Sequence, residues 1–146
     1  METLTMLILP ALLWREIEDR TRRALPDETC GLLLGRRRGA EVLVSALAAA
    51  RNIAPDPRKH FELDPLDTLA AEDGARALGC SVVGAWHSHP RGPLQISAHD
   101  QAGADSTWLT LIAVPKAHGG IELGCWRKGH AGFERLEVGE PQSLHN

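Results

Sequence analysis

Short apolar runs alternate with amphipathic stretches along this chain of 146 residues. Helical periodicity and start signals such as Asp64-Pro65 predict helices over residues 11–25, 65–78 and 97–105. Apolar or alternating runs predict strands over residues 30–35, 41–50, 60–63, 81–86, 108–114, 121–127 and 133–138, with residues 4–9 as a strand or an extended lead-in. We therefore expect one α/β domain with a mixed sheet flanked by helices.

The composition is that of one globular domain with its own core. Apolar residues make up 43% of the chain, charged residues 24%, and the formal net charge is −3. No basic patch predicts a nucleic-acid partner, and no segment reaches the roughly 18 apolar residues that a membrane span needs. Residues 1–138 are expected to form the domain, and residues 139–146 a flexible polar tail.

Cysteine usage and the N-terminus bear on the compartment. The chain has three cysteines, Cys30, Cys80 and Cys125. An odd number is not the pattern of a disulfide framework, and the absence of Cys-x-x-Cys spacing argues against a thiolate zinc site. The first apolar run is short, and Glu2 lies where a signal peptide would be basic. A reducing cytoplasm is the compartment we expect.

The stretch from His87 to Asp100 carries the candidate chemistry. His87 and His89 are two residues apart on a predicted strand, so both imidazoles project to one side. Ser97 and Asp100 are spaced as the N-cap and third residue of a helix. Two imidazoles and one carboxylate leave a tetrahedral position for water, as in catalytic zinc sites. A capping box needs no metal, however, so the spacing by itself leaves both interpretations open.

The same residues resemble the signature of the JAMM (MPN-plus) metalloproteases: His87-x-His89, seven residues, then Ser97-x-x-Asp100. Upstream, Glu28 precedes an apolar strand bounded by glycines, as in that family. The resemblance implies the JAMM/MPN fold, a mixed and mostly antiparallel sheet related to that of cytidine deaminases.

The resemblance also implies an activity. It predicts a peptidase with one Zn²⁺ per chain, held by His87, His89 and Asp100, that cuts amide bonds at the C-terminal tail of ubiquitin-like proteins. Glu28 would be the general base, and Ser97 would donate to the oxyanion. Without the resemblance, residue patterns do not select Glu28 over its acidic neighbours. The compact chain is similar to small bacterial members that process sulfur-carrier proteins after Gly-Gly.

Three alternatives follow from the same residues. An isopeptidase that removes ubiquitin-like modifiers from lysine would need the same site. A binding module without chemistry would lack a ligand or Glu28, and all these residues are present. A zinc deaminase would carry Glu at position 89 and a Pro-Cys-x-x-Cys segment, and neither is found. No pattern predicts the oligomeric state.

Overall fold

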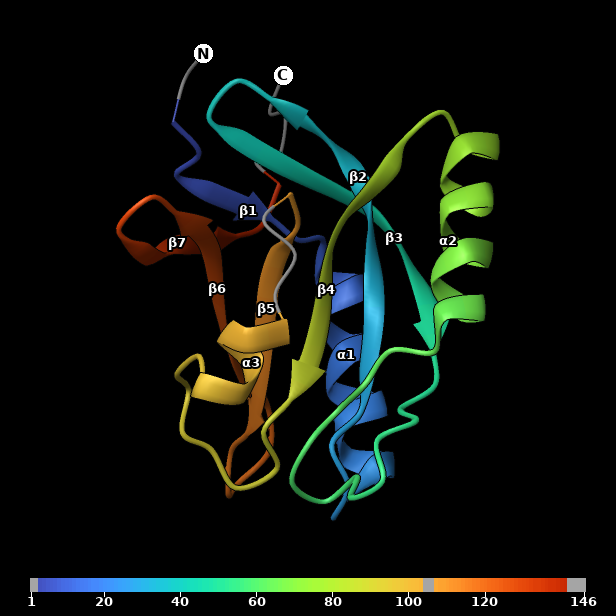
Figure 1. Cartoon of the computed structure of the whole chain (residues 1–146). Coiled ribbons are helices and arrows are strands. Elements are labelled where there is room, and N and C mark those ends of the chain that lie inside the picture. The colour runs from blue at the N-terminus through green and yellow to red at the C-terminus, as the bar shows by residue number, and fades with distance from the viewer. Residues whose placement is uncertain (1–2, 104–106, 142–146) are drawn as a thin grey trace.

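The computed structural model describes residues 3–103 and 107–141, and Figure 1 shows their arrangement. Within these residues the chain forms three helices and seven strands. In chain order they are β1 (Met6–Ile8), α1 (Ala11–Ala24), β2 (Cys30–Arg38), β3 (Glu41–Ala50), α2 (Pro65–Ala77), β4 (Ser81–Ser88), α3 (Ala98–Gly103), β5 (Leu109–Pro115), β6 (Ile121–Gly129) and β7 (Gly132–Gly139).

The strands close into a barrel in the order β1-β3-β2-β4-β5-β6-β7. β1 pairs in parallel with both β3 and β7, and β4 pairs in parallel with β5, whereas the other four pairings are antiparallel. The prediction of a single mixed α/β sheet is therefore confirmed. The expected sheet flanked by helices is corrected in one respect, because the three residues of β1 bridge both edges and close it.

Two apolar clusters occupy opposite faces of this curved sheet. Leu33 and Trp86 belong to the larger cluster, to which α1 contributes the fully buried Ile17. The neighbouring residues Leu32 and Leu34 belong to the second cluster, where α2 packs with Ala71 and Ala75. Alternate residues of β2 thus face different helices, as the twofold period of a strand requires. This explains why β2 is a continuous apolar run.

The glycines that bound the apolar part of β2 are required by close packing. A Cβ on Gly31 would collide with the Trp86 indole of β4. A Cβ on Gly35 would collide with the carbonyl oxygen of Leu43, at the irregularity in the β2–β3 pairing. Both glycines allow β2 to lie tightly between its neighbours, which places the residues just before β2 next to the end of β4.

Several predicted boundaries are corrected. Arg36 to Arg38 continue β2 instead of forming the turn, and the turn begins at Gly39, which has a φ of 61°. Residues 60–63 form no strand, since only an isolated bridge joins Leu63 to Asn52. The third helix ends at Gly103, and the rest of the prediction lies in residues 104–106, outside the described part.

The predicted C-terminal boundary of the domain and the predicted tail after it are only partly covered by the structure. Gly139 is the last residue of β7 and pairs with Ile8 of β1. The remainder of the expected tail falls mainly on residues 142–146, which lie outside the described residues.

Among the described helices, none has the length and apolar character to cross a membrane.

Candidate metal centre

Ser88 fastens the beginning of β2 to the end of β4. Its hydroxyl accepts from the Thr29 amide at 3.0 Å, and its own amide donates to the Thr29 carbonyl at 2.9 Å. Ser88 is fully buried and points to the face opposite its histidine neighbours. Glu28 is consequently held beside His87 and His89. Sequence patterns assigned no role to Ser88, and only its place between two histidines could have suggested one.

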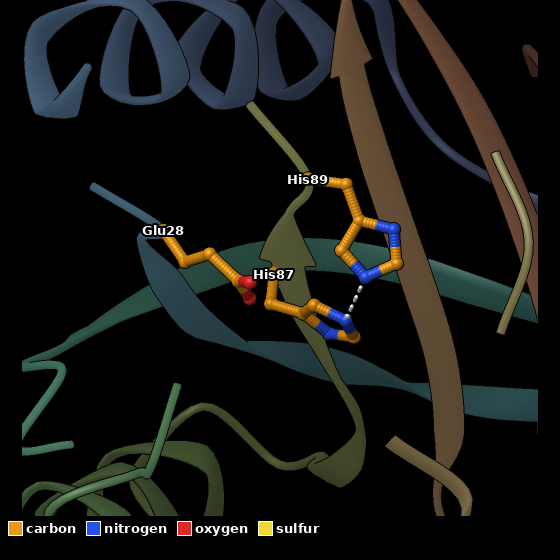
Figure 2. A group of neighbouring side chains, drawn as sticks. All are labelled: Glu28, His87 and His89. Carbon is orange, nitrogen blue, oxygen red and sulfur yellow. Dashed lines mark hydrogen bonds between the residues drawn. The ribbon is translucent and has the colours of Figure 1, made fainter. Parts of the chain in front are cut away.

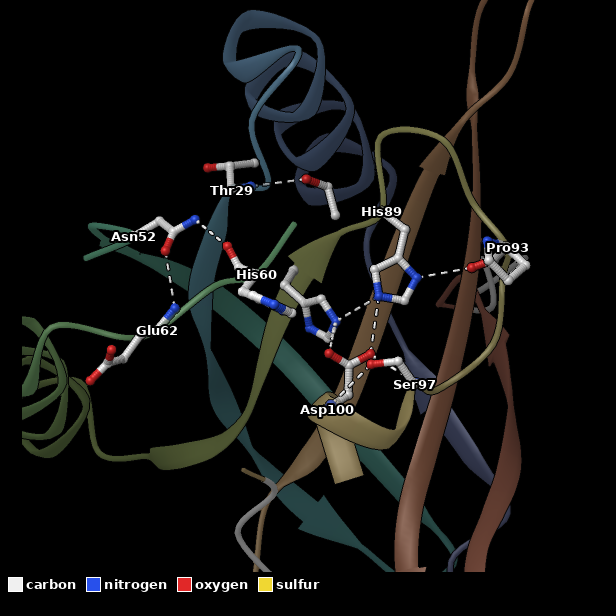
Figure 3. A network of polar contacts seen from close by, with 10 residues as sticks. Thr29, Asn52, His60, Glu62, His89, Pro93, Ser97 and Asp100 are labelled. Atoms are coloured by element: carbon white, nitrogen blue, oxygen red, sulfur yellow. Dashed lines mark hydrogen bonds and ion pairs between the residues drawn. The ribbon is translucent and has the colours of Figure 1, made fainter. Parts of the chain in front are cut away.

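Asn52 holds Glu28 from the other side. The side-chain amide of Asn52 donates to the Glu28 carbonyl at 2.9 Å and to the His60 carbonyl at 3.0 Å. Its Oδ1 accepts from the backbone amides of Ala54 and Glu62, both at 3.0 Å. One half-buried asparagine therefore joins the loop after β3 to the segment before β2. Figure 3 shows its contacts with His60 and Glu62 of that loop. No spacing rule in the sequence predicts such a long-range link.

His87, His89 and Asp100 converge on one point. The Asp100 carboxylate lies 3.1 Å from His87 Nε2 through Oδ1 and 3.0 Å from His89 Nε2 through Oδ2. The two Nε2 atoms are 3.2 Å apart. All three residues are buried, and Figure 3 shows the polar ends of His89 and Asp100 turned toward each other. The structure thus brings the three predicted ligands together.

Hydrogen bonding indicates that a proton or a metal ion lies between His89 and Asp100. His89 Nδ1 is 2.9 Å from the carbonyl oxygen of Pro93, which can only accept, so Nδ1 carries the proton. In neutral His89 the Nε2 atom is then an acceptor, and it faces Asp100 Oδ2, a second acceptor. Two lone pairs at 3.0 Å repel each other unless a proton or a metal ion lies between them.

The donor set and its spacing fit zinc. Imidazole nitrogen and carboxylate oxygen are ordinary zinc ligands, at about 2.0–2.2 Å from the ion. Tetrahedral ligands at that distance are separated by roughly 3.3 Å, close to the 3.0–3.2 Å between the atoms of this triangle. The Pro93 carbonyl also fixes His89 in the tautomer that leaves Nε2 free for a metal.

Asp100 is oriented by the start of α3. Its amide donates to Ser97 Oγ at 3.0 Å, while its Oδ2 accepts from the Ser97 amide at 3.0 Å. The predicted capping box is therefore confirmed, and it coexists with the histidine contacts. Burial raises the pKa of Asp100, but hydrogen bonds with His87 and His89, together with the charge of His87 and the Ser97 amide, outweigh it and hold the pKa well below its usual range. Asp100 is thus ionised.

The two histidines have different surroundings. His87 is fully buried and its ring stacks on Phe61 with centroids 4.1 Å apart. Burial lowers the pKa of His87, and its Nδ1 has no hydrogen-bond partner among the described residues. Burial also acts to lower the pKa of His89, but the hydrogen bonds to Asp100 and Pro93 and the nearby carboxylates raise it overall. A metal ion bound to the Nε2 atoms of His87 and His89 would take the place of any proton on those two atoms.

Glu28 lies beside the triangle (Figure 2). One ligand atom from each of Glu28, His87 and His89 lies within 4.8 Å of the other two. Asp100 makes short contacts to both histidines, so both carboxylates are candidates to join the two imidazoles around a metal ion. Glu28 is only 8% exposed, and burial raises its pKa to about 7, although the positive charge of His89 opposes the rise. Such a carboxyl can accept and return a proton near neutral pH.

Two cavities open on either side of this cluster. One, of about 360 Å³, includes Phe61, Leu63 and Trp108 in its lining, together with His87 and Asp100. The other, of about 640 Å³, reaches Glu28, His89 and Ser97. The five predicted site residues therefore divide between the linings of the two cavities.

The other residues singled out in the sequence lie outside the group formed by His87, His89 and Asp100. His99 is exposed, and its ring lies 4.1 Å from that of His60. Cys30 and Cys125 are buried free thiols, and burial raises the pKa of each to about 12. Neither thiol is a reactive nucleophile at neutral pH.

Comparison with known families decides the relationship. Residues 10–127 match the family model of prokaryotic homologs of the JAB domain. The chain belongs to this family. The match covers most of the chain and all five predicted site residues, so the JAMM resemblance drawn from the sequence is confirmed.

Two curated relatives and one solved structure are similar to this JAB-family chain. It is 35% identical over 91 residues to a desampylase of Haloferax volcanii, and 33% identical over 95 residues to a probable TtuB-protein conjugate cleaving protease of Thermus thermophilus. The matches cover 62% and 65% of this chain, and 64% and 61% of those relatives. A solution structure of a Desulfitobacterium hafniense protein superposes with a TM-score of 0.83 at 29% identity, covering 97% of this chain and 95% of that one.

Proposed function

We propose that this chain is a zinc-dependent peptidase of the JAMM type that hydrolyses the amide bond after the C-terminal Gly-Gly of a ubiquitin-like sulfur-carrier protein. The observation that carries the proposal is the convergence of His87, His89 and Asp100 beside the buried acid Glu28. The similarity to a desampylase of Haloferax volcanii and a probable TtuB-protein conjugate cleaving protease of Thermus thermophilus supports a conjugate-cleaving activity.

In this proposal His87, His89 and Asp100 hold one Zn²⁺. Bound zinc would lower the pKa of a water molecule and polarise the substrate carbonyl. Glu28 accepts a proton from the attacking water and returns it to the nitrogen of the departing amine. Ser97 Oγ already accepts from the Asp100 amide, so its own proton remains free to donate to the developing oxyanion. Asn52 and Ser88 keep the backbone around Glu28 in place.

A cleavage assay with metal analysis tests this proposal. The substrate is a sulfur-carrier protein extended by one residue after Gly-Gly, and the proteins are wild type, Glu28→Gln and His89→Ala. We expect cleavage by wild type alone, with one zinc bound to wild type and Glu28→Gln but not to His89→Ala. Glu72→Gln and His118→Ala are matched controls, since both side chains are exposed and line neither cavity.

Each failure points to a different alternative. Zinc binding without cleavage of the linear substrate, but with cleavage of a lysine-linked conjugate, would establish the isopeptidase. Absence of zinc from the wild-type protein would reject the metal site and favour a binding module.

A further inference from the structure

The larger cavity beside Glu28 carries an unusual charge. Its lining includes three exposed cations, Arg58, Lys59 and Arg91, whereas Glu28 is its one acidic residue among those described. No ion pair or side-chain hydrogen bond engages the three cations within residues 3–103 and 107–141. The whole chain has a net charge of −3, so this cavity differs in sign from the molecule around it.

The three cations come from two segments that meet at the site. Arg58 and Lys59 lie in the loop after β3, which the Glu28 amide holds by donating to the Pro57 carbonyl at 2.7 Å. Arg91 lies in the loop that leaves His89 and returns to Ser97, whose path Figure 3 shows next to Pro93. The Pro93 carbonyl anchors that loop to His89 Nδ1. The fold thus presents positive charge from two directions next to the proposed base.

The place of Glu28 indicates which half of a substrate this cavity receives. A base that returns its proton to the departing amine must come within hydrogen-bond reach of that nitrogen. Glu28 lines the basic cavity and does not line the smaller cavity. The departing side of the scissile bond therefore extends into the basic cavity.

We infer that Arg58, Lys59 and Arg91 select a departing group that bears a free α-carboxylate, so that a single amino acid or a very short extension is released after Gly-Gly. The inference rests on the proposed peptidase function. Cations without partners attract a carboxylate, and Arg can bind one in a bidentate manner. A cavity of about 640 Å³ has ample room for one residue. Lysine in an isopeptide linkage carries no free carboxylate at this position.

Matched substrates test this selection. The same carrier protein ends in Gly-Gly-Ala with either a free carboxylate or a carboxamide, and kcat/KM is measured for each. We expect wild type to prefer the carboxylate by about tenfold, since each partly exposed pair contributes a few-fold, and we expect the preference to decrease with added salt. Arg91→Ala should reduce the ratio about threefold, and Arg58→Ala/Lys59→Ala/Arg91→Ala should abolish it. Lys128→Ala, an exposed cation on the β6–β7 hairpin, should leave the ratio unchanged.

The ratio separates this inference from the proposed function. It is measured within one preparation, so a partly unfolded variant does not alter it. Equal cleavage of both substrates by wild type overturns the inference and leaves the peptidase standing, whereas cleavage of neither overturns the peptidase. A readout independent of turnover is the Kd of Glu28→Gln for the two substrates, where we again expect about tenfold tighter binding of the carboxylate form.

A third substrate identifies the source of the negative charge. A carrier ending in Gly-Gly-Asp carboxamide has an acidic side chain but no α-carboxylate. Cleavage at the rate of the alanine carboxamide supports α-carboxylate recognition. Cleavage as fast as the free-carboxylate substrate overturns it in favour of acidic side chains.

Discussion

The carboxylates of Asp64 and Asp100 both lie at helix starts, yet their surroundings differ. Asp64 caps α2 by accepting from the Leu66 amide at 2.9 Å, and Arg51 forms an ion pair with it at 2.7 Å. Asp100 accepts from the Ser97 amide at α3, but its other neighbours are the two imidazoles of the site. The side chain of Asp64 is 14% exposed and that of Asp100 4%.

This difference separates a structural carboxylate from a candidate ligand. Asp64 has a permanently charged partner, so its charge is compensated within the chain. Asp100 has only histidines, whose protons can be exchanged for a metal ion. A carboxylate at a helix start therefore serves stability alone in α2, whereas in α3 it also faces two imidazoles as a candidate metal ligand.

The substitution expected to reduce zinc binding and cleavage most is Asp100→Asn. Removing the charged ligand should eliminate stable zinc binding and reduce cleavage by at least about 100-fold. The matched Asp64→Asn keeps a side chain that caps helices well, so its activity should stay within about twofold of wild type. Zinc content and kcat/KM are measured for both. Full zinc occupancy in Asp100→Asn would remove Asp100 from the ligand set.

Ser97→Gly separates the two roles of Ser97. Glycine is tolerated at an N-cap, so the free energy of unfolding should fall by only a few tenths of a kcal/mol. Loss of the hydroxyl donor should lower kcat by about 10²–10³. Chemical denaturation and steady-state kinetics measure the two quantities. A kcat equal to that of wild type would restrict Ser97 to its capping role.

Glu28→Gln should change how stability depends on pH in metal-free protein. The pKa of Glu28 rises from its ordinary 4.5 to about 7 on folding, so its contribution to stability is complete below pH 4.5 and is lost as pH increases through 7. At about 1.4 kcal/mol per pH unit, the variant should gain up to about 3 kcal/mol over wild type between pH 4 and pH 8. Urea unfolding with a chelator present measures this, and Glu62→Gln serves as the exposed control. A pH-independent difference would contradict the buried environment of Glu28.

Zinc should stabilise the folded chain. At a free concentration 100 times its Kd, an ion that binds only the folded state adds about 2.7 kcal/mol to the free energy of unfolding. A chelator should remove this gain. The wild-type shift should exceed that of Asp100→Asn, whereas Asp64→Asn should match wild type. Equal shifts in all three proteins would indicate zinc binding elsewhere.

The smallest effect belongs to the cap of α2. Asp64→Ala removes both the cap and the ion pair with Arg51, so the free energy of unfolding should decrease by about 1 kcal/mol. Cleavage and zinc binding should not change. A loss of zinc in this variant would show that α2 influences the site, against the comparison drawn above.

Local pattern was sufficient for much of the fold. Periodicity located α1, α2 and most strands, since each buries one face against the sheet. It misplaced the turn after β2, because Arg36 to Arg38 lack an apolar pattern but still pair with residues 41–43 of β3. It also predicted a strand over residues 60–63, where a single bridge to Asn52 exists.

The sequence by itself determined the residue types and spacings of the candidate site. His87 and His89 share one side because strand geometry has a period of two, and Ser97 and Asp100 cap one helix because residues three apart lie about one turn from each other. These relations are local, so no distant contact is needed to establish them.

Only the tertiary structure decided the rest. Barrel closure by β1, the link from Asn52 to Glu28 and the meeting of Asp100 with both histidines join residues that are far apart in the chain. The basic cavity likewise combines Arg58 and Lys59 of one loop with Arg91 of another. Such contacts depend on how packed elements are placed in space, which periodicity and spacing do not encode.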